Sequence, residues 1–493
     1  MAGEGFASGL VKLGGGLKVA QASSFTAIWK TEGAIFYAPT SLEDGFCVLG
    51  HYGQPSTRKL DGWVLVAAEE TPDSVLAKPQ DFTLAWSHAS SGGYVWIPVP
   101  PSGYSAVGCF VSTSSTKPPL DAIRCVRSDL TDRCEFDSLI WKSTDQNAVG
   151  FYSLRPVERG TTAMGVPVGT FGVGSNADNL ACLKNTNTSI SYMPSLPQTH
   201  TLFKSSAPII YFHPDEKYLP SSVPWYFSKE IFLYNKGDEA NPQKVDPSGS
   251  NLPQGGSNDG NYWIDLTGDA AAIEAVRRGD ISTSEAYIHV KPMFGGTFTD
   301  IATWVFCPFN GPGRAKVGLA TIPLGKLGQH ACDWEHVTLR ISNFSGKVSR
   351  VYCSQHSSGR WYEPSELEVT GEGRVVIYSS LNGHAMYAKA GTDMQGTQQI
   401  GLRNDTAKSN KVMDCAAKYV VMTEDIPWVN YYGHWGAKVT YHTDSEIKNV
   451  ESHLLPSARP SFDKFVRSLP KEVLGEESPT GPIAKSSWTG DEK

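Results

Sequence analysis

The sequence predicts a mainly β protein, in which a pseudo-threefold, β-prism-like repeat domain precedes a β-sandwich domain with few short helices. A sequence pattern recurs three times in the first part of the chain, and the rest consists of short β-branched and aromatic runs broken by Gly, Pro, Ser and Asp. The 493 residues exceed one ordinary core, so we expect two domains. Hydrophobic residues at 40% and charged residues at 19% are typical of a folded globular protein.

Two markers define the repeat: a hexapeptide that begins and ends with Gly, and a tryptophan that precedes a turn and an aromatic strand. They occupy Gly45–Gly50, Gly103–Gly108 and Gly160–Gly165, and Trp29, Trp86 and Trp141. Three all-β units should close around a pseudo-threefold axis, as in a β-prism or a β-trefoil, and four strands per unit favour the prism. We expect the tryptophans to pack at the axis and the glycines to hold turns or bulges. Alternatively, loops at one end bind a glycan or a lipid headgroup.

The repeat ends near residue 195, where the composition changes. We therefore place the repeat domain at residues 1–195 and the sandwich domain at residues 196–475. Helical periodicity is scarce in the second part, where Ala270–Arg278 and Ser461–Ser468 are the expected short helices. Residues 476–493 are rich in Glu, Ser, Pro, Gly and Lys, and we expect a mobile tail there.

The segment His330–His336 contains two carboxylates and two histidines at the start of an alternating apolar and polar run. Strand geometry puts Asp333 and Glu335 on the face shared with Val337, which should point inward. Buried carboxylates need a cation, a base or many hydrogen bonds. Oxygen ligands beside an imidazole favour Mg²⁺, Ca²⁺ or Mn²⁺ over a thiolate zinc site.

Composition excludes several classes of protein. The net charge of -7 argues against a nucleic-acid partner. Nine scattered cysteines without a Cys-x-x-Cys pair fit a reducing compartment. The first residues lack the features of a signal peptide, and no run of about 18 apolar residues could span a bilayer. We therefore expect a cytoplasmic protein, free or peripherally attached to a membrane, with no transmembrane segment.

The segment Gly328–His336 resembles the Gly-His-Arg-His-Asp-Trp-Glu signature of necrosis-inducing, NLP-type proteins. This resemblance implies an actinoporin-like β-sandwich that holds a divalent cation at a membrane-sphingolipid headgroup site. It implies Asp333 as a direct ligand, with His330, Glu335 and His384 acting directly or through water. Asn310 stands where that family has Asp, and this loss of a carboxylate should weaken cation binding.

The whole chain resembles the plant vacuolar protein sorting 62-like proteins. The matching landmarks are Gln21–Phe25, Arg124–Asp132, Tyr211–Pro220, Asn251–Gly260, Phe298–Asp300, Asp333–Val337 and Arg403–Ser409. They extend over nearly the full length. The biochemical activity of that family is undefined, so the resemblance implies no specific reaction.

Two further clusters are open to more than one interpretation. The aromatic residues Trp428, Tyr431, Tyr432 and Trp435 either bind a membrane interface or a sugar, or pack in the core. The segment His213–Glu216 either adds carboxylates to the cation site or caps a turn.

The sequence predicts binding rather than catalysis, because it contains no Gly-x-Ser-x-Gly elbow and no recognisable nucleophile signature. We expect divalent-cation-assisted binding of membrane lipid headgroups or glycans, in trafficking or defence. One alternative is a toxin-like, membrane-damaging defence protein that is pore-forming, cytolytic or insecticidal. The other is a metal-dependent hydrolase, in which Glu335 or a histidine acts as base.

Overall fold

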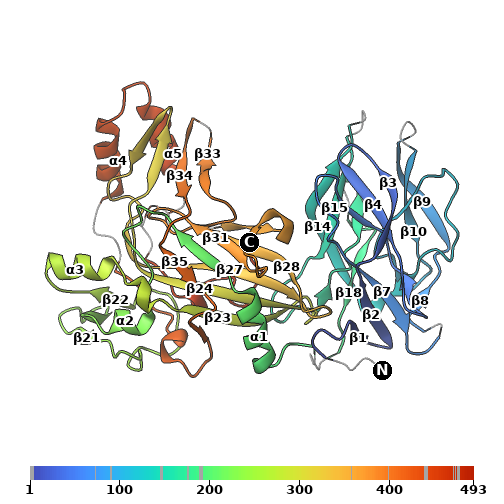
Figure 1. The fold of residues 1–493 in the computed structure, drawn as a ribbon, viewed down its shortest axis with the longest axis horizontal. Helices are drawn as coiled ribbons and strands as arrows, with labels where there is room; N and C mark the ends of the chain where they lie inside the picture. Colours follow the sequence, from blue (N-terminus) through green and yellow to red (C-terminus); the bar gives the residue numbers. More distant parts are fainter. Residues whose placement is uncertain are drawn as a thin grey trace.

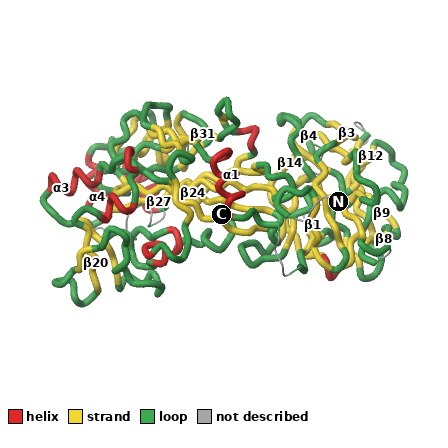
Figure 2. The backbone as a smooth tube through the Cα atoms, turned by 60° about the horizontal axis from the view of Figure 1, so that its bottom comes forward, coloured by secondary structure: helices red, strands yellow, loops and turns green. Residues whose placement is uncertain are grey.

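The structure, a computed structural model, describes residues 5–72, 74–88, 92–144, 148–174, 177–187, 192–356, 358–397, 399–437, 442–469, 471, 474 and 478–493. Two lobes lie in line along the longest axis, and a smaller outer lobe rises from the C-terminal one (Figure 1). Strands make up most of the regular structure of the two large lobes, and the outer lobe combines strands with helices (Figures 1 and 2). The predicted mainly β class is therefore confirmed.

The N-terminal lobe consists of short antiparallel sheets. Its strands are β1 (Leu10–Gly14), β2 (Leu17–Ala22), β3 (Phe25–Lys30), β4 (Ala34–Pro39), β5 (Cys47–Val48), β6 (Tyr52–Pro55), β7 (Val64–Glu69), β8 (Leu76–Ala77), β9 (Asp81–His88), β10 (Gly93–Val99), β11 (Tyr104–Ser105), β12 (Phe110–Ser112), β13 (Cys125–Arg127), β14 (Thr131–Lys142), β15 (Gly150–Pro156), β16 (Gly165–Val166), β17 (Phe171–Val173) and β18 (Ala181–Lys184), with a 3-10 turn at Ser128–Leu130.

The repeated tryptophans meet in the core of this lobe. Each belongs to one of three equivalent hairpins, β3–β4, β9–β10 and β14–β15, and each hairpin carries a β-bulge beside its tryptophan. The ring centroids are 5.5 Å apart for Trp29 and Trp86, 6.0 Å for Trp29 and Trp141, and 5.8 Å for Trp86 and Trp141. The repeat therefore has a physical basis in one shared aromatic cluster, as expected.

The glycine marker needs a correction in its third copy. A Cβ on Gly50 or on Gly108 would lie 2.6 or 2.7 Å from the side chain of Thr170, so these three residues come together. Gly165 does not join them and instead begins β16. The third copy is therefore longer than sequence comparison indicates. The assignment to a β-prism stays a prediction, because the first two units each pair their strands in two small sheets, whereas the third forms one five-stranded sheet, β16-β18-β14-β15-β17.

The C-terminal part begins with α1, whose Ser195 N-cap forms a capping box with Gln198. Its helices are α1 (Leu196–Ser206), α2 (Val223–Phe227), α3 (Ala270–Arg277), α4 (Thr443–Ser452) and α5 (Arg459–Arg467), with 3-10 turns at Ile281–Thr283, Pro364–Glu366, Pro427–Asn430 and Pro482–Ala484. Helices α3 and α5 lie where the sequence predicts short helices. None of the helices in the described ranges is long and apolar enough to span a membrane.

The strands of the C-terminal part form the large and the small sheet of the sandwich and two further sheets. The strands are β19 (Ile209–Phe212), β20 (Ile231–Asn235), β21 (Gln243–Lys244), β22 (Tyr262–Leu266), β23 (Ala286–Met293), β24 (Phe298–Asn310), β25 (Arg314–Val317), β26 (Ala320–Pro323), β27 (His330–Ser342), β28 (Val348–Gln355), β29 (Ser358–Tyr362), β30 (Glu368–Val369), β31 (Val375–Ser379), β32 (Met386–Tyr387), β33 (Gly391–Gly396), β34 (Ile400–Thr406), β35 (Val412–Asp414) and β36 (Tyr419–Val421). The order is β29-β28-β27-β24-β23-β36 in the large sheet and β30-β31-β19-β35 in the small one, and the two further sheets are β21-β20-β22 and β26-β25-β34-β33. Ile301, Val337 and Leu339 of the large sheet share a buried core with Ile210 and Ile377 of the small one.

The expected mobile tail is wrong for its described residues, 478–493. The C-terminus lies against the sandwich beside β28 (Figure 1), where Tyr352 Oη donates a hydrogen bond to Lys493 O at 2.6 Å, and Asp491 and Glu492 are buried. The Trp488 ring stacks on His289 with 3.6 Å between centroids, and Thr489 O accepts a hydrogen bond from Thr161 N of the N-terminal lobe. Composition suggested mobility, but this segment finds specific charged and aromatic partners on the sandwich.

Candidate functional site

Strands β24 and β27 bring the predicted site residues together. They pair antiparallel, with Asn310 opposite His330 and Cys307 opposite Asp333, so the end of one strand faces the start of the other. Alternation along β27 puts Asp333 and Glu335 on the face of Val337, and Trp334 on the opposite face, as the sequence predicts.

Asp333 forms a buried ion pair with His384, which comes from the loop after β31. His384 Nδ1 lies 2.9 Å from Asp333 Oδ2, and His384 Nε2 lies 2.8 Å from the carbonyl oxygen of Tyr218. Both partners are acceptors, so His384 donates from both nitrogens as an imidazolium. Burial lowers the pKa of His384, but Cys307, Asp333 and Glu216 outweigh burial and raise it well above its usual value. Burial by itself would raise the pKa of Asp333, yet the hydrogen bond and positive charge of His384 shift it downward overall.

Glu335 is in the opposite protonation state. Burial and the negative charge of Asp333 raise its pKa to about 8, so most of it is protonated at neutral pH. Its carboxyl hydrogen-bonds the hydroxyl of Ser354 on β28. Two carboxyl groups on one strand face therefore differ in charge, because only Asp333 has an imidazolium partner.

The expected divalent cation can be tested against these hydrogen bonds. His330 Nδ1 lies 2.8 Å from Cys332 O and therefore carries a proton, which leaves Nε2 as an acceptor, as in metal-binding histidines. Asn310 donates from Nδ2 to Gly328 O at 2.6 Å and so keeps its Oδ1 available as an acceptor. In this arrangement His384 has no free lone pair and Glu335 is protonated, so neither is available as a cation ligand. The described ranges contain no group of three His, Cys, Asp or Glu residues placed to hold a metal ion, so the cation stays a prediction.

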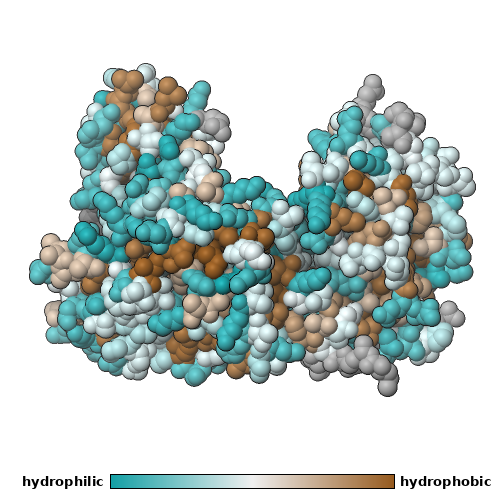
Figure 3. Space-filling view, in the orientation of Figure 1, coloured by the Kyte–Doolittle hydropathy of each residue, from teal (hydrophilic) through white to brown (hydrophobic). Residues whose placement is uncertain are grey.

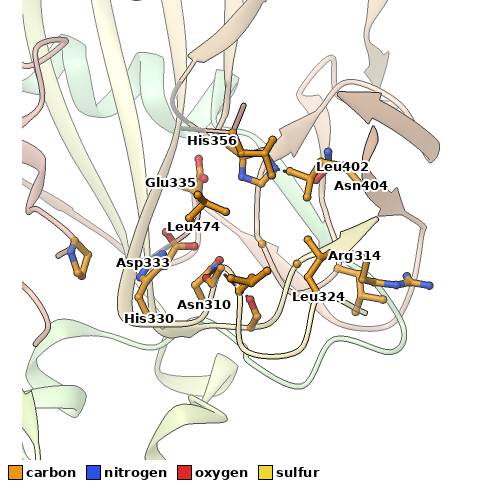
Figure 4. Close-up of a pocket in the computed structure, with 18 of the residues that line it drawn as sticks. Asn310, Arg314, Leu324, His330, Asp333, Glu335, His356, Leu402, Asn404 and Leu474 are labelled. Atoms are coloured by element: carbon orange, nitrogen blue, oxygen red, sulfur yellow. Dashed lines mark hydrogen bonds between the residues drawn. The ribbon is translucent and has the colours of Figure 1, made fainter. Parts of the chain in front are cut away.

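A small cavity of about 80 Å³ opens beside these residues (Figure 4). Polar side chains and leucines both line it, and they alternate around the cavity, with Leu474 between Glu335 and Asp333 and Leu402 beside Asn404 in Figure 4. The polar residues include Asn310, Arg314, His330, Asp333, Glu335, His356, Arg403, Asn404 and Lys485, and the leucines are Leu324, Leu327, Leu381, Leu402, Leu469 and Leu474. A cavity of this size holds a few waters or one small polar group.

Asn404 is a cavity residue that sequence reasoning missed. Its Oδ1 lies 3.0 Å from His356 Nε2, but its buried Nδ2 has no hydrogen-bond partner among the described residues. The residue is only 4% exposed, so bulk water does not satisfy this donor. The only signal in the sequence is the landmark Arg403–Ser409, which marks the strand without indicating a site.

Strained backbone conformations also cluster around this cavity. Of the eight described non-glycine residues with φ above zero, four surround the cavity or its ion pair: Cys332, His356, Asn382 and His384. Such conformations cost about 1–3 kcal/mol each and cluster at functional sites. Glu216, which sequence reasoning left open, helps to hold one of them, because its carboxylate accepts a hydrogen bond from Asn382 N at 2.5 Å.

The aromatic cluster packs in the core, so its interpretation as a binding surface is wrong for Trp428, Tyr431 and Trp435. Trp428, Tyr431 and Trp435 are buried, and Tyr432 is half-buried. Trp428 stacks on Trp334 with centroids 5.7 Å apart, and Trp435 meets the same ring edge-on at 5.2 Å. These rings pack on the face of β27 opposite Asp333, so they form core rather than a ligand platform.

Comparison with known proteins gives a family. The family model described as vacuolar protein sorting-associated protein 62, Vps62, matches residues 1–492. The chain belongs to the Vps62 family. No curated protein matches this Vps62-family chain in sequence.

Several solved structures are similar to parts of this Vps62-family chain. GNIP1Aa from Chromobacterium piscinae is 16% identical over 38% of this chain and 40% of that protein, with a TM-score of 0.29. Necrosis and Ethylene inducing Protein 2, from the causal agent of cocoa's Witches Broom disease, is 14% identical over 40% of this chain and 69% of its own, with a TM-score of 0.21. NLPPya in complex with glucosamine is 13% identical over 51% and 89%, with a TM-score of 0.23.

Proposed function

We propose that this Vps62-family protein binds the hydroxyl groups of a sugar, free or as a lipid headgroup, in the cavity at the ends of β24 and β27. The unpartnered Nδ2 of Asn404 carries this proposal. A buried donor without an acceptor costs about 1–3 kcal/mol, and a ligand oxygen would satisfy it. The function is binding, in line with the absence of a nucleophile signature.

The mixture of donors and acceptors favours hydroxyl groups over an anion. Asp333 offers a carboxylate and His330 a ring nitrogen, both acceptors, whereas Asn404 and the protonated Glu335 offer donors. A hydroxyl both donates and accepts, so it can satisfy either kind of partner. The leucines provide apolar surface around these polar groups, and apolar lining with a few polar groups is typical of small-molecule sites.

Calorimetry and a glycan array test the proposal. The variant Asn404→Ala should weaken binding of the sugar selected on the array about tenfold, because it removes one donor worth about 1.4 kcal/mol. Asn241→Ala is the matched control, since Asn241 is exposed in a distant turn. A wild-type protein that binds no glycan or glycolipid would overturn the proposal.

A divalent cation remains part of the proposal as a separate step. Asp333, Asn310 and His330 would hold Mg²⁺, Ca²⁺ or Mn²⁺, which would then bridge the protein to ligand hydroxyls. We expect EDTA to weaken sugar binding by the wild type and to leave Asp333→Asn unchanged. Equal binding with and without EDTA would remove the cation and keep the sugar.

Hydrolysis is the second candidate, because one carboxyl of the cavity is ionised and the other is protonated. In glycosidases, a protonated carboxyl acts as the acid and an ionised carboxylate acts as the base or nucleophile. Turnover of an array-selected glycan that is lost in Glu335→Gln would favour hydrolysis. Dye release from vesicles tests the membrane-damaging alternative separately, since a binding protein should leave vesicles intact.

A further inference from the structure

The outer lobe has its own small core. Strands β26-β25-β34-β33 form one sheet, and helices α4 and α5 pack on it (Figure 1). The buried residues include Val317 from β25, Leu402 from β34, and Phe462 from α5. The outer lobe is therefore a packed subdomain with its own hydrophobic core.

Two leucines lie outside this core at turns of the lobe. Leu319, in the turn between β25 and β26, is fully exposed, and Leu455, in the connection between α4 and α5, is 76% exposed. Their neighbours Val317 and Leu454 are both buried in the same core, so the two turns belong to one unit. Figure 3 shows hydrophobic side chains at the outer end of this lobe. Burial of one leucine is worth about 1.5–3 kcal/mol, which is lost at both positions.

The form and charge of this end favour a lipid surface as the occupant. The leucines sit on projecting turns rather than in a groove, so they suit a soft apolar medium that they can enter. Residues 312–327 contain Lys316 and Lys326, together with Arg314, which is ion-paired with Asp405, and no acidic residue. The lobe as a whole (312–327, 391–397, 399–406 and 442–469) has eight Lys and Arg against six Asp and Glu, a charge of +2 in a chain of -7. Anionic lipids attract such a surface.

We propose that the outer lobe docks on an anionic lipid membrane by inserting Leu319 and Leu455. The same lobe borders the cavity, because Arg314, Leu324 and Leu402 line it. Docking therefore brings the cavity near the headgroups and identifies a glycolipid as the source of the sugar. This last step rests on the proposed function, whereas the insertion of the leucines does not.

Sedimentation of the full chain with vesicles tests the docking. The probe is phosphatidylcholine vesicles that contain phosphatidylserine, with no glycolipid, so the cavity has no sugar to bind. The double variant Leu319→Glu/Leu455→Glu should lose binding at least tenfold, because two apolar contacts become two charges. Leu139→Glu/Leu196→Glu is the matched control, since those leucines are 54% and 58% exposed in other parts of the molecule.

The sedimentation results distinguish docking on the membrane from its alternatives. Docking is supported if the wild type and the control pair sediment with the vesicles and the double variant does not. It is overturned if the wild type stays in solution, if both pairs behave alike, or if light scattering shows that the double variant only separates two copies of the chain. Asn404→Ala keeps vesicle binding if docking is right, even where sugar binding is lost, so the two proposals fail separately. Circular dichroism confirms that the double variant is folded.

Discussion

Strand β27 carries buried charge on both faces, and the two clusters differ in whether their polar atoms are satisfied. On one face, Arg340 Nε and Nη2 lie 2.8 Å from the two oxygens of Asp300, and Nη2 lies 2.6 Å from Asp491. Glu492 accepts hydrogen bonds from His336 at 3.0 Å and Thr338 at 2.7 Å. We call this the tail face, because the final residues cover it.

On the other face, the cavity face, Asp333 has a cationic partner, but Glu335 is protonated and the nearby Asn404 keeps an unpartnered donor. The tail face resembles a finished structural network, in which every charge has a partner of opposite sign. The cavity face resembles a site that a ligand completes. Buried charge alone therefore does not identify a functional site. Unsatisfied buried polar atoms also occur on the core rings of Trp304 and Trp334 on the tail face, so what distinguishes Asn404 is that the residue with the unpartnered donor lines a cavity.

The largest expected effect is on the tail face. Arg340→Met should lower the free energy of unfolding by about 3–5 kcal/mol, because it leaves Asp300 buried without its ion-pair partner and removes one of the two arginines that pair with Asp491, the other being Arg159. Denaturation in urea measures this loss. The matched variant on the cavity face, Asp333→Asn, should cost clearly less, since the amide keeps an acceptor oxygen for His384. Equal losses would contradict the distinction between the faces.

The second effect is a pH dependence at Glu492. His336 and Lys291 outweigh burial and lower the pKa of this carboxyl to about 2, below its usual 4.5. A depressed pKa contributes stability above pH 4.5 that is lost as the pH falls toward 2, and the contribution is about 3 kcal/mol at neutral pH. Glu492→Gln should therefore be less stable than the wild type at pH 7 and nearly equal to it at pH 2. Urea denaturation at several pH values tests this, and parallel pH profiles would be the contrary result.

Sequence patterns predict some features of the fold and of the cavity face and miss others. Trp29, Trp86 and Trp141 indicated a shared core because aromatic residues in register need common partners. Asp333 and Glu335 indicated a site because strand alternation is local. The tail face escaped prediction, since Asp491 and Glu492 lie about 150 residues from their partners and their local composition resembles a flexible end. Asn404 could not be predicted, because whether a side-chain donor has a partner depends on contacts between strands that the sequence does not show.

The third effect is a pH dependence of stability at Glu335 on the cavity face, opposite in direction to that at Glu492. Burial and Asp333 raise the pKa of Glu335 to about 8, so its stabilising contribution is complete below pH 4.5 and is lost as the pH rises through 8. Glu335→Gln cannot ionise and should gain at least about 1.4 kcal/mol over the wild type between pH 6 and pH 9. Thermal or urea denaturation at the two pH values measures the gain. If the two proteins change in parallel with pH, Glu335 is ionised throughout and the donor that it offers to a sugar is lost from the proposal.

The smallest effect on stability belongs to Asn404. Asn404→Ala removes the hydrogen bond to His356, worth about 1 kcal/mol, but it also removes a buried donor that has no partner, and the two terms oppose each other. We therefore expect the free energy of unfolding to change by less than about 1 kcal/mol, in contrast to Arg340→Met on the tail face. A saturating sugar should raise the melting temperature of the wild type more than that of the variant, because only ligand that binds the folded state stabilises it. A large loss of stability without ligand would mean that Asn404 is a structural residue, and the cavity face would then be as complete as the tail face.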